Sequence, residues 1–235
     1  MATFLEIQTK VKTRLIDTPA AVLAEVPGMV NTVLHDAQVK HNFKVMETLG
    51  GPYTTSISPN RVLTTIPSDF KEARGDPYRV YFTTGRSIPV PWAANRNAVQ
   101  GFYYPTAVGP PAFLVHAEPG NTGVANVEVW PLSDTNSDYA NGEYRIYIPY
   151  WRFLPPLSAD GDTNWFTVRC EMYLVHMACA LGFEVDWDEE RMSVQKQLAK
   201  EQWDQILLED KRMRLAQTNT LVIHRQGANS PALRR

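Results

Sequence analysis

Five histidines and two cysteines are the residues of this 235-residue chain best suited to bind a metal ion or act as nucleophiles. The histidines are His35, His41, His116, His176 and His224. No pair of them has the i, i+4 spacing that places two ligands on one face of a helix. Cys170 and Cys179 lie in an apolar segment, which is typical of small core residues rather than redox or catalytic groups. The sequence therefore predicts no metal site, no cofactor and no disulfide framework.

Carboxylates form two groups with spacings that resemble functional sites. The first has the positions 1, 3, 5 and 12 of a calcium loop and consists of Asp160, Asp162, Asn164 and Glu171. Position 6 of that loop must be glycine and is Trp165 here, so we expect a turn with Asp162 or Thr163 capping a helix. The second group includes Asp186 and Asp188, and it is more typical of solvated charges at a helix start than of an acid–base pair. No phosphate loop or nucleophile elbow accompanies them, and the sequence predicts no enzyme.

Aromatic and basic side chains offer two further binding chemistries. The aromatic cluster has side chains of the kind that stack on sugars or bases, and it consists of Tyr147, Tyr150, Trp151 and Phe153. A strand of alternating aromatics is more typical of a core or a subunit interface. The tail holds Arg225, Arg234 and Arg235, too sparse for strong phosphate binding, so a flexible arm that orders on a protein partner is at least as good an interpretation.

Proline separates the elements that must position these groups. Of 17 prolines, 14 lie between Pro52 and Pro156, and residues 157–230 contain none. Proline removes a backbone donor and is excluded from helix interiors, so a strand-and-loop region is predicted between two helical flanks. We therefore expect an α+β fold, in which both chain ends form a helical bundle around an inserted antiparallel β-domain. The predicted segments are bundle helices 1–50, β-domain 51–157, bundle helices 158–218 and a flexible C-terminal arm 219–235.

Apolar spacing predicts the individual helices. Phe4, Ile7, Val11 and Leu15 form one stripe of a helix, and a second stripe runs from about residue 30 towards Phe43. In the second flank, residues 164–181 are apolar nearly all round, as expected of a central helix, and Gly182 should end it. A long helix is predicted from about 188 to 215, with acidic residues at its start and basic ones at its end.

Alternation with period two predicts the strands. The strongest case places four side chains on one face of a strand, namely Tyr144, Ile146, Ile148 and Tyr150. Tyr78, Val80 and Phe82 form a second alternating set, and Val127 and Val129 form a third. Long loops around 105–111 and 133–141 are the kind that usually bind something.

Composition excludes several classes of protein. A hydrophobic fraction of 44% and a charged fraction of 20% indicate a globular protein rather than a disordered one. No apolar run reaches the roughly 18–20 residues of a membrane span, and the N-terminus does not resemble a secretory signal. With net charge −2 and pI near 6.2, the chain has no positive field to attract nucleic acid. We expect synthesis in a reducing cytoplasm, no membrane partner and no sequence-specific nucleic acid.

In its order of motifs, the chain resembles the head-to-tail connector, or adaptor, proteins of tailed bacteriophages. Three stretches carry the resemblance: the helical pattern from Met29 to Glu47, the turn Ile66-Pro67-Ser68-Asp69-Phe70, and the run from Tyr144 to Ser158 followed by Thr163-Asn164-Trp165. The resemblance spans residues 4–218. It implies a virion structural protein that forms a ring, usually of twelve copies, beneath the portal. Such a ring links the portal to the tail or nozzle and helps to retain packaged DNA.

This resemblance and the charge pattern together suggest two interaction surfaces. A closed ring has heterologous contacts, so one patch must complement a different patch of the next copy. Candidates for the acidic side are Glu184, Asp186, Asp188, Glu189 and Glu190, and candidates for the basic side are Arg86, Arg96 and Arg152. The candidate portal-binding arm contains Leu221, Ile223, His224, Arg225, Leu233, Arg234 and Arg235. The alternative is a tail-associated sugar- or receptor-binding module, which would explain the aromatic strand but not the helical chain ends.

Overall fold

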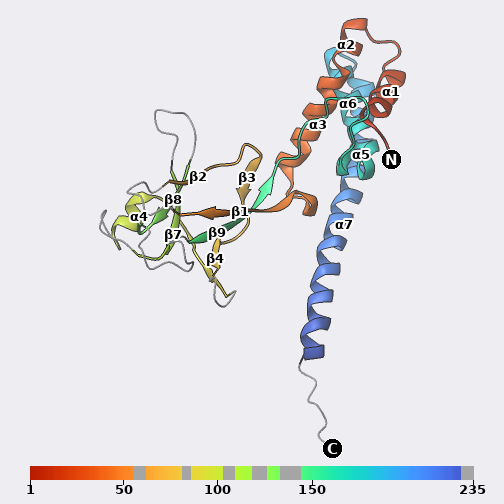
Figure 1. Ribbon diagram of the computed structural model, residues 1–235. Coiled ribbons are helices and arrows are strands. Elements are labelled where there is room, and N and C mark those ends of the chain that lie inside the picture. The colour runs from red at the N-terminus through yellow and green to blue at the C-terminus, as the bar shows by residue number, and fades with distance from the viewer. Residues whose placement is uncertain (56–61, 81–85, 103–108, 118–125, 133–143, 229–235) are drawn as a thin grey trace, which may run out of the picture. The chain divides into compact units, whose positions relative to one another are not determined.

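The computed structural model describes residues 1–55, 62–80, 86–102, 109–117, 126–132 and 144–228 (Figure 1). The chain forms two compact units. Both chain ends, Met1–Val45 and Leu154–Arg235, build the first, which we call the helical unit. Residues Met46–Phe153 build the second, the β unit. The predicted α+β fold, with a helical bundle made by both ends and β structure inserted between them, is confirmed.

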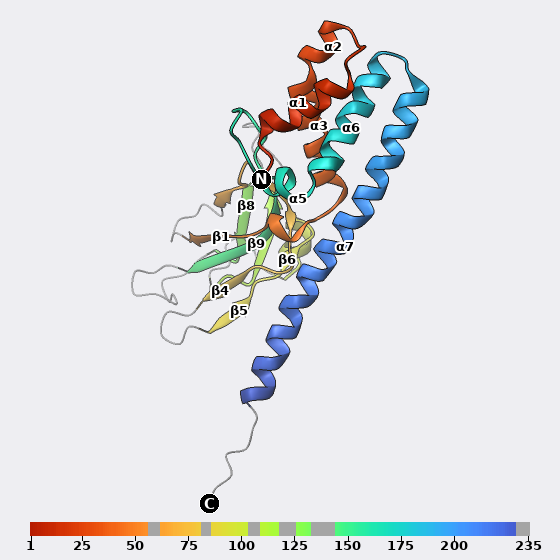
Figure 2. The same ribbon diagram turned by 90° about the vertical axis from the view of Figure 1, so that its right-hand side faces the viewer.

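The helical unit packs elements that are far apart in the sequence. Its helices are α1 (Phe4–Arg14), α2 (Ala20–Ala24), α3 (Val26–Lys40), α5 (Trp165–Arg169), α6 (Glu171–Val185) and α7 (Glu189–Ala228). Both α1 and α3 pack against α6, which is the central helix, and α7 packs along its other side (Figure 2). The predicted stripe Phe4, Ile7, Val11 and Leu15 is buried throughout, because it faces this centre. No helix among the described residues is long and apolar enough to cross a membrane.

Short polar motifs fix where the helices begin. Thr3 and Glu6 form a capping box at the start of α1, which satisfies two amide donors that have no partner in the helix. Two more amides of this first turn bind the loop before α5: Phe4 donates to the carbonyl of Asp162 at 3.0 Å, and Leu5 to that of Asp160 at 3.1 Å. The start of α5 is capped by Asn164 and Thr167, not by Asp162 or Thr163 as predicted. Asn164 is the cap because its side-chain oxygen accepts a hydrogen bond from the Thr167 amide at 3.0 Å.

Three predicted helix boundaries in the second flank are wrong. The segment 164–181 is not one helix, because α5 ends at Arg169 and α6 begins at Glu171, with Cys170 in a non-helical conformation between them. Gly182 does not end α6 but lies inside it. A Cβ on Gly182 would lie 2.6 Å from Leu15 Cδ1, so this glycine serves the close approach of α1's end. Finally, α7 continues past Leu215 to Ala228.

The β unit consists of two sheets. The first is ordered β1 (Glu47–Thr54), β9 (Arg145–Arg152), β4 (Tyr78–Val80) and β5 (Ser87–Pro89), and β3 (Phe70–Ala73) also pairs with β9. The second is ordered β2 (Val62–Thr65), β8 (Asn126–Trp130), β7 (Phe113–Ala117) and β6 (Trp92–Ala93). All the described pairs are antiparallel except β6 with β7, which is parallel. A short helix, α4 (Arg96–Gln100), and the 3₁₀ turn η1 (Lys44–Met46) complete the elements.

One core joins the two sheets of the β unit. Ile146 and Ile148 of β9 face Val127 and Val129 of β8, and Leu114 lies among them, all buried. The predicted common face of Val127 and Val129, and that of Ile146 and Ile148, is therefore confirmed, although Glu128 and Trp130 of β8 are buried as well. On β4 the buried side chain is that of Arg79, and its neighbours Tyr78 and Val80 are only half-buried. Arg79 lies against the Tyr144 ring, 5.6 Å from its centroid. Phe82 lies outside the described residues.

A glycine lets β1 bend where it pairs with β9. The register of the two strands shifts between Gly50 and Tyr53, which marks a bulge. Gly51 has φ +106°, and a Cβ there would lie 2.7 Å from the carbonyl oxygen of Ile146. No other residue type fits both the conformation and the space.

Candidate functional site

The turn between α6 and α7 is the most unusual local structure in the helical unit. It is a Schellman motif, in which the amide of Asp188 donates to the carbonyl of Phe183 at 2.9 Å and that of Trp187 to Glu184 at 3.3 Å. The position that requires a left-handed backbone is usually glycine, but here it is Trp187, with φ +58°. A side chain in this conformation costs roughly 1–2 kcal/mol. The fold therefore holds a tryptophan where a glycine would be more stable.

Trp187 is also exposed. Its side chain is 88% accessible, although a tryptophan is normally among the largest contributors to a core. Carboxylates surround it in sequence: Asp186 and Glu189 are exposed, and neither forms an ion pair with any residue that the structure describes. We call residues 184–190 the acidic turn. Its combination of one large apolar side chain and unpaired carboxylates is typical of a docking surface rather than of a reaction centre.

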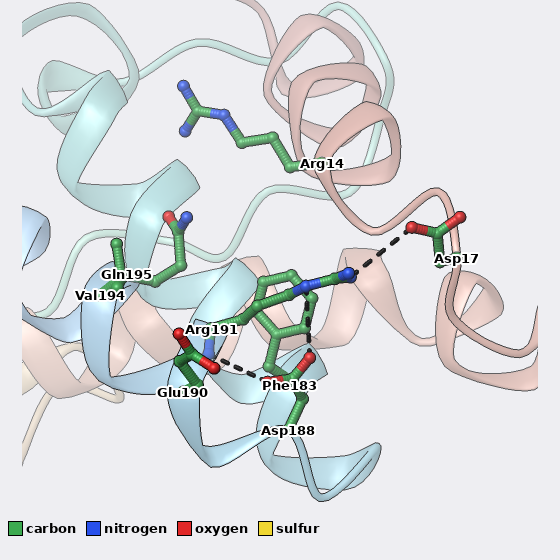
Figure 3. Close-up of a pocket in the computed structure, with 8 residues that line it drawn as sticks. All are labelled: Arg14, Asp17, Phe183, Asp188, Glu190, Arg191, Val194 and Gln195. Carbon is green, nitrogen blue, oxygen red and sulfur yellow. Dashed lines mark hydrogen bonds and ion pairs between the residues drawn. The ribbon is translucent and has the colours of Figure 1, made fainter.

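One carboxylate of the acidic turn, Asp188, has a partner close by in the chain. Figure 3 shows Arg191 reaching Asp188, with Nε 3.3 Å from Oδ2, and Asp17, with Nη1 3.6 Å from Oδ2. The same guanidinium lies 5.7 Å from the ring centroid of Phe183. These residues line a pocket together with Arg14, Glu190, Val194 and Gln195. Because its opposite charges already pair across it, the pocket offers little to an outside ligand.

Glu184 differs from the expectation for the acidic group. It does not lie at the start of α7 but in the last turn of α6, where the helix dipole disfavours a negative charge. Lys196 of α7 offsets this, with its Nζ 3.7 Å from Glu184 Oε2. Of the five predicted acidic interface residues, Asp186, Glu189 and Glu190 therefore remain the ones whose charge is not balanced by a described ion pair.

A second surface of the helical unit carries the opposite charge. Lys40 of α3 and Lys196 and Lys200 of α7 line a depression of about 180 Å³. Its remaining lining is Tyr173, Met177 and Trp203. The rings of Tyr173 and Trp203 lie 5.0 Å apart, and burial, followed by the charge of Asp36, raises the pKa of Tyr173 to about 12. We call these six residues the basic depression. Sequence reasoning missed it, although lysines at 196 and 200, one turn apart on a helix, were a signal.

The predicted basic interface residues all lie in the β unit. Arg96 at the start of α4 binds Glu128 of β8 through two hydrogen bonds, 2.8 Å from Nε and 2.5 Å from Nη2. This pairing raises the pKa of Arg96 and uses its charge inside the unit. Arg86 precedes β5 and Arg152 ends β9, and both are exposed. Contact between these arginines and the acidic turn of a neighbour remains a prediction.

The predicted C-terminal arm begins as helix. Residues 219–228 continue α7, so Leu221, Ile223, His224 and Arg225 belong to this helix rather than to an irregular segment. Leu233, Arg234 and Arg235 lie outside the described residues. The predicted helix end at about residue 215 was wrong, because α7 runs to Ala228 and includes Gly227.

Two buried polar side chains hold the chain where it leaves and re-enters the helical unit. Asp210 of α7, only 1% exposed, accepts from the amide of Lys44 at 2.6 Å and from Arg214 Nε at 2.8 Å, and its Oδ2 lies 3.0 Å from His41 Nε2. Gln38 of α3, 2% exposed, accepts from the amide of Leu154 at 2.5 Å. Burial opposes ionisation of Asp210, but these hydrogen bonds outweigh it and lower its pKa.

Metal-ligand clusters and readily ionised thiols are absent from the described residues. No cluster of three or more metal-ligating side chains occurs among them. Burial raises the pKa of Cys179 to about 11 and raises that of Cys170 further, so neither thiol is ionised near neutral pH. Asp162, part of the calcium-like pattern, accepts from the amides of Ser158 and Ala159 at 2.7 and 2.8 Å, which makes it a turn residue.

The aromatic strand β9 is used for packing. Tyr150 is buried and donates its hydroxyl to Asp69 at 3.1 Å, and Trp151 is also buried. Tyr147 stacks on Tyr78, with centroids 5.4 Å apart. These rings already have partners within the β unit, which removes the main argument for a sugar-binding face.

The comparisons agree with the motif order of the sequence. No curated protein sequence matches the chain. A family model described as SU10 adaptor protein matches residues 2–225, which include both units and most of α7. The chain belongs to the SU10 adaptor protein family, a family of phage head–tail adaptors, and is a structural component of the virion.

Proposed function

We propose that the chain forms a closed ring of twelve copies beneath the portal, joins the portal to the tail or nozzle, and helps to retain packaged DNA. The observation that carries the proposal is the family match over residues 2–225, which covers both units. Function in such a protein depends on geometry: many small contacts, repeated around a ring, sum to a stable assembly. Assembly takes place in the cytoplasm of the host, and the ring occupies the head–tail junction.

The net charge of the chain suits a ring that surrounds DNA without binding it tightly. The net charge is −2, so the wall of a lumen built from this chain does not act as a strong counter-ion for phosphate. DNA then passes through without sequence-specific binding. Retention is a steric and mechanical task that the ring performs together with the portal and the tail.

The end of α7 is proposed to bind the portal. This helix has 40 residues and continues beyond the other helices of its unit, as Figure 2 shows. Residues 219–235 carry three arginines and no acidic residue, so the segment suits an acidic or polar groove. Portal binding by this arm buries its apolar residues Leu221, Ile223 and Leu233.

Native mass measurement tests the proposal. The chain is measured alone and mixed with the portal ring of the same virus, and the expected product is the portal plus twelve chains of 26.6 kDa. A chain that ignores the portal contradicts the proposal. A variant lacking residues 219–235 keeps the described core of the helical unit and should lose portal binding, while undiminished binding contradicts the role of the arm.

A further inference from the structure

We propose that the acidic turn of one copy docks into the basic depression of the next copy, with Trp187 as its apolar anchor. The inference rests on the proposed ring and identifies the contact that closes it. Both surfaces belong to the helical unit, and each has what the other lacks. One projects a tryptophan among carboxylates, and the other presents lysines around an aromatic floor.

The unpaired charges on the two surfaces have opposite signs. Asp186 and Glu189 form no ion pair among the described residues, and the same is true of Lys40 and Lys200. Lysines that flank an apolar floor favour a partner that brings carboxylates and one large apolar side chain together. Asp36 lies close enough to Tyr173 to influence its pKa, and Glu184 pairs with Lys196 of the depression. Against these two carboxylates, the three lysines leave one positive charge in excess.

Trp187 does not fill the basic depression of its own chain. Trp187 keeps 88% of its surface accessible, whereas Tyr173 is buried and Trp203 half-buried in the floor of the depression. The acidic turn is the connection between α6 and α7, and the depression lies further along, among α3, α6 and α7. The two surfaces adjoin at the ion pair of Glu184 with Lys196. A turn that meets the side of a neighbour makes a heterologous contact, which is the kind a closed ring requires.

The left-handed backbone at Trp187 supports a binding role for this side chain. Glycine is the usual residue at this position of a Schellman motif, and tryptophan there contradicts the local preference. Such local conflicts occur where function outweighs stability. The two backbone hydrogen bonds of the motif hold the turn in place, so the anchor is presented with little ordering left to occur on binding.

Removal of the anchor tests the contact. Trp187→Gly keeps the left-handed turn and should raise the protein concentration needed for half-maximal ring assembly at least roughly tenfold. Asp186→Lys with Glu189→Lys should weaken assembly, as should Lys40→Glu with Lys200→Glu. The chain that combines all four reversals should regain it. Glu201→Lys with Asp204→Lys changes charge equally at exposed positions that do not line the depression, and should leave assembly unchanged.

Covalent trapping distinguishes a ring contact from a two-fold pair. The native cysteines, Cys170 and Cys179, are buried, so engineered cysteines are the accessible thiols. Oxidation of the variant with Glu189→Cys and Lys200→Cys should give a ladder of dimers, trimers and larger species on a denaturing gel. Each single variant should give no ladder. A ladder that stops at dimers, or none at all, overturns the proposed contact.

The two proposals fail in different ways. If the unaltered chain forms no ring with the portal, the proposed function is wrong. If the unaltered chain forms the ring but Trp187→Gly assembles equally well and no ladder appears, the ring stands and this contact is wrong. The portal mixture described above serves for both measurements.

Discussion

The two units of the molecule use charged side chains differently. In the β unit, Arg96 is bound to Glu128, Arg74 to Glu47 at 3.0 Å, and Arg79 is buried against an aromatic ring. In the helical unit, Asp186, Glu189, Lys40 and Lys200 remain without described ion pairs. In these pairs, charge in the β unit stabilises the fold, whereas the helical unit keeps several charges of both signs available for other chains. In the β unit, the exposed Arg152 also has no described ion pair.

The largest expected effect comes from emptying the core of the helical unit. Phe43 is fully buried and packs against Trp165, Phe166 and Trp203, with ring centroids 5.0–5.6 Å away. Phe43→Ala should lower the free energy of unfolding of the helical unit by about 3–5 kcal/mol. Hydrogen exchange should show the loss in α6 and not in β9. Equal losses in both would mean that the two units unfold as one, and Phe43→Leu serves as the milder control.

The corresponding experiment in the β unit creates a cavity in its core. Ile146 is fully buried between the two sheets, so Ile146→Ala should cost about 2–5 kcal/mol. Protection of β8 and β9 should fall while that of α6 is retained. Ile146→Val removes one methylene and should cost about 0.5–1.5 kcal/mol. If β9 stays fully protected in Ile146→Ala, the shared core is not what holds the sheets together.

A smaller effect is expected at the point where the chain passes between the units. Asp210→Asn removes the charge that accepts hydrogen bonds from Lys44, His41 and Arg214, and should destabilise the helical unit by about 2–3 kcal/mol at pH 7. The pKa of Asp210 is lower in the folded chain than its ordinary value of 3.8. Its contribution is therefore present above that value and is lost as the pH falls through the folded pKa.

Unfolding by urea at several pH values measures this contribution. The original chain and Asp210→Asn should differ at neutral pH and converge in acid. Asp204→Asn, an exposed position on the same helix, provides the control and should change stability little at any pH. A constant difference between the original chain and Asp210→Asn down to pH 2 would contradict the role assigned to the carboxylate.

The smallest expected effect is a gain in stability rather than a loss. Trp187→Gly should stabilise the helical unit of the unassembled chain by about 1 kcal/mol, because glycine adopts φ +58° without steric cost. The same variant should assemble more weakly, so stability and assembly should move in opposite directions. A loss of stability, measured by thermal unfolding of the unassembled chain, would mean that Trp187 packs against its own unit instead.

The spacing of apolar residues predicted helices and strands in both units, but it did not predict where the structure departs from the usual local rules. The stripe from Phe4 to Leu15 and the alternation at Ile146 and Ile148 are repeated patterns, and the structure confirms both. Gly182 was misread because a glycine near a helix end usually terminates it, whereas the approach of Leu15 that requires it is a contact over more than 160 residues. Local sequence contains no information about such a neighbour.

The candidate surfaces were predicted in part for the same reason. The residues of the acidic turn are consecutive, so their charges could be recognised as one group in the sequence. The basic depression combines Lys40 with Lys196 and Lys200, and only the packing of α3 beside α6 and α7 brings them together. Arg96 was assigned to an interface because its partner Glu128 lies 32 residues away, on a strand whose pairing the sequence did not reveal.

The insertion of the β unit also determines the order in which a ribosome can complete the two units. Val11 of α1 packs against α6, where Cys179 follows it by 168 residues. All the residues of the β unit have been synthesised by Phe153, before α5, α6 or α7 exist. At about 5–20 residues per second, the 130 residues between α3 and α6 take about 6.5–26 s to make. The first helices therefore wait with their apolar stripes uncovered while the inserted unit folds, and they acquire their core only when the central helix emerges.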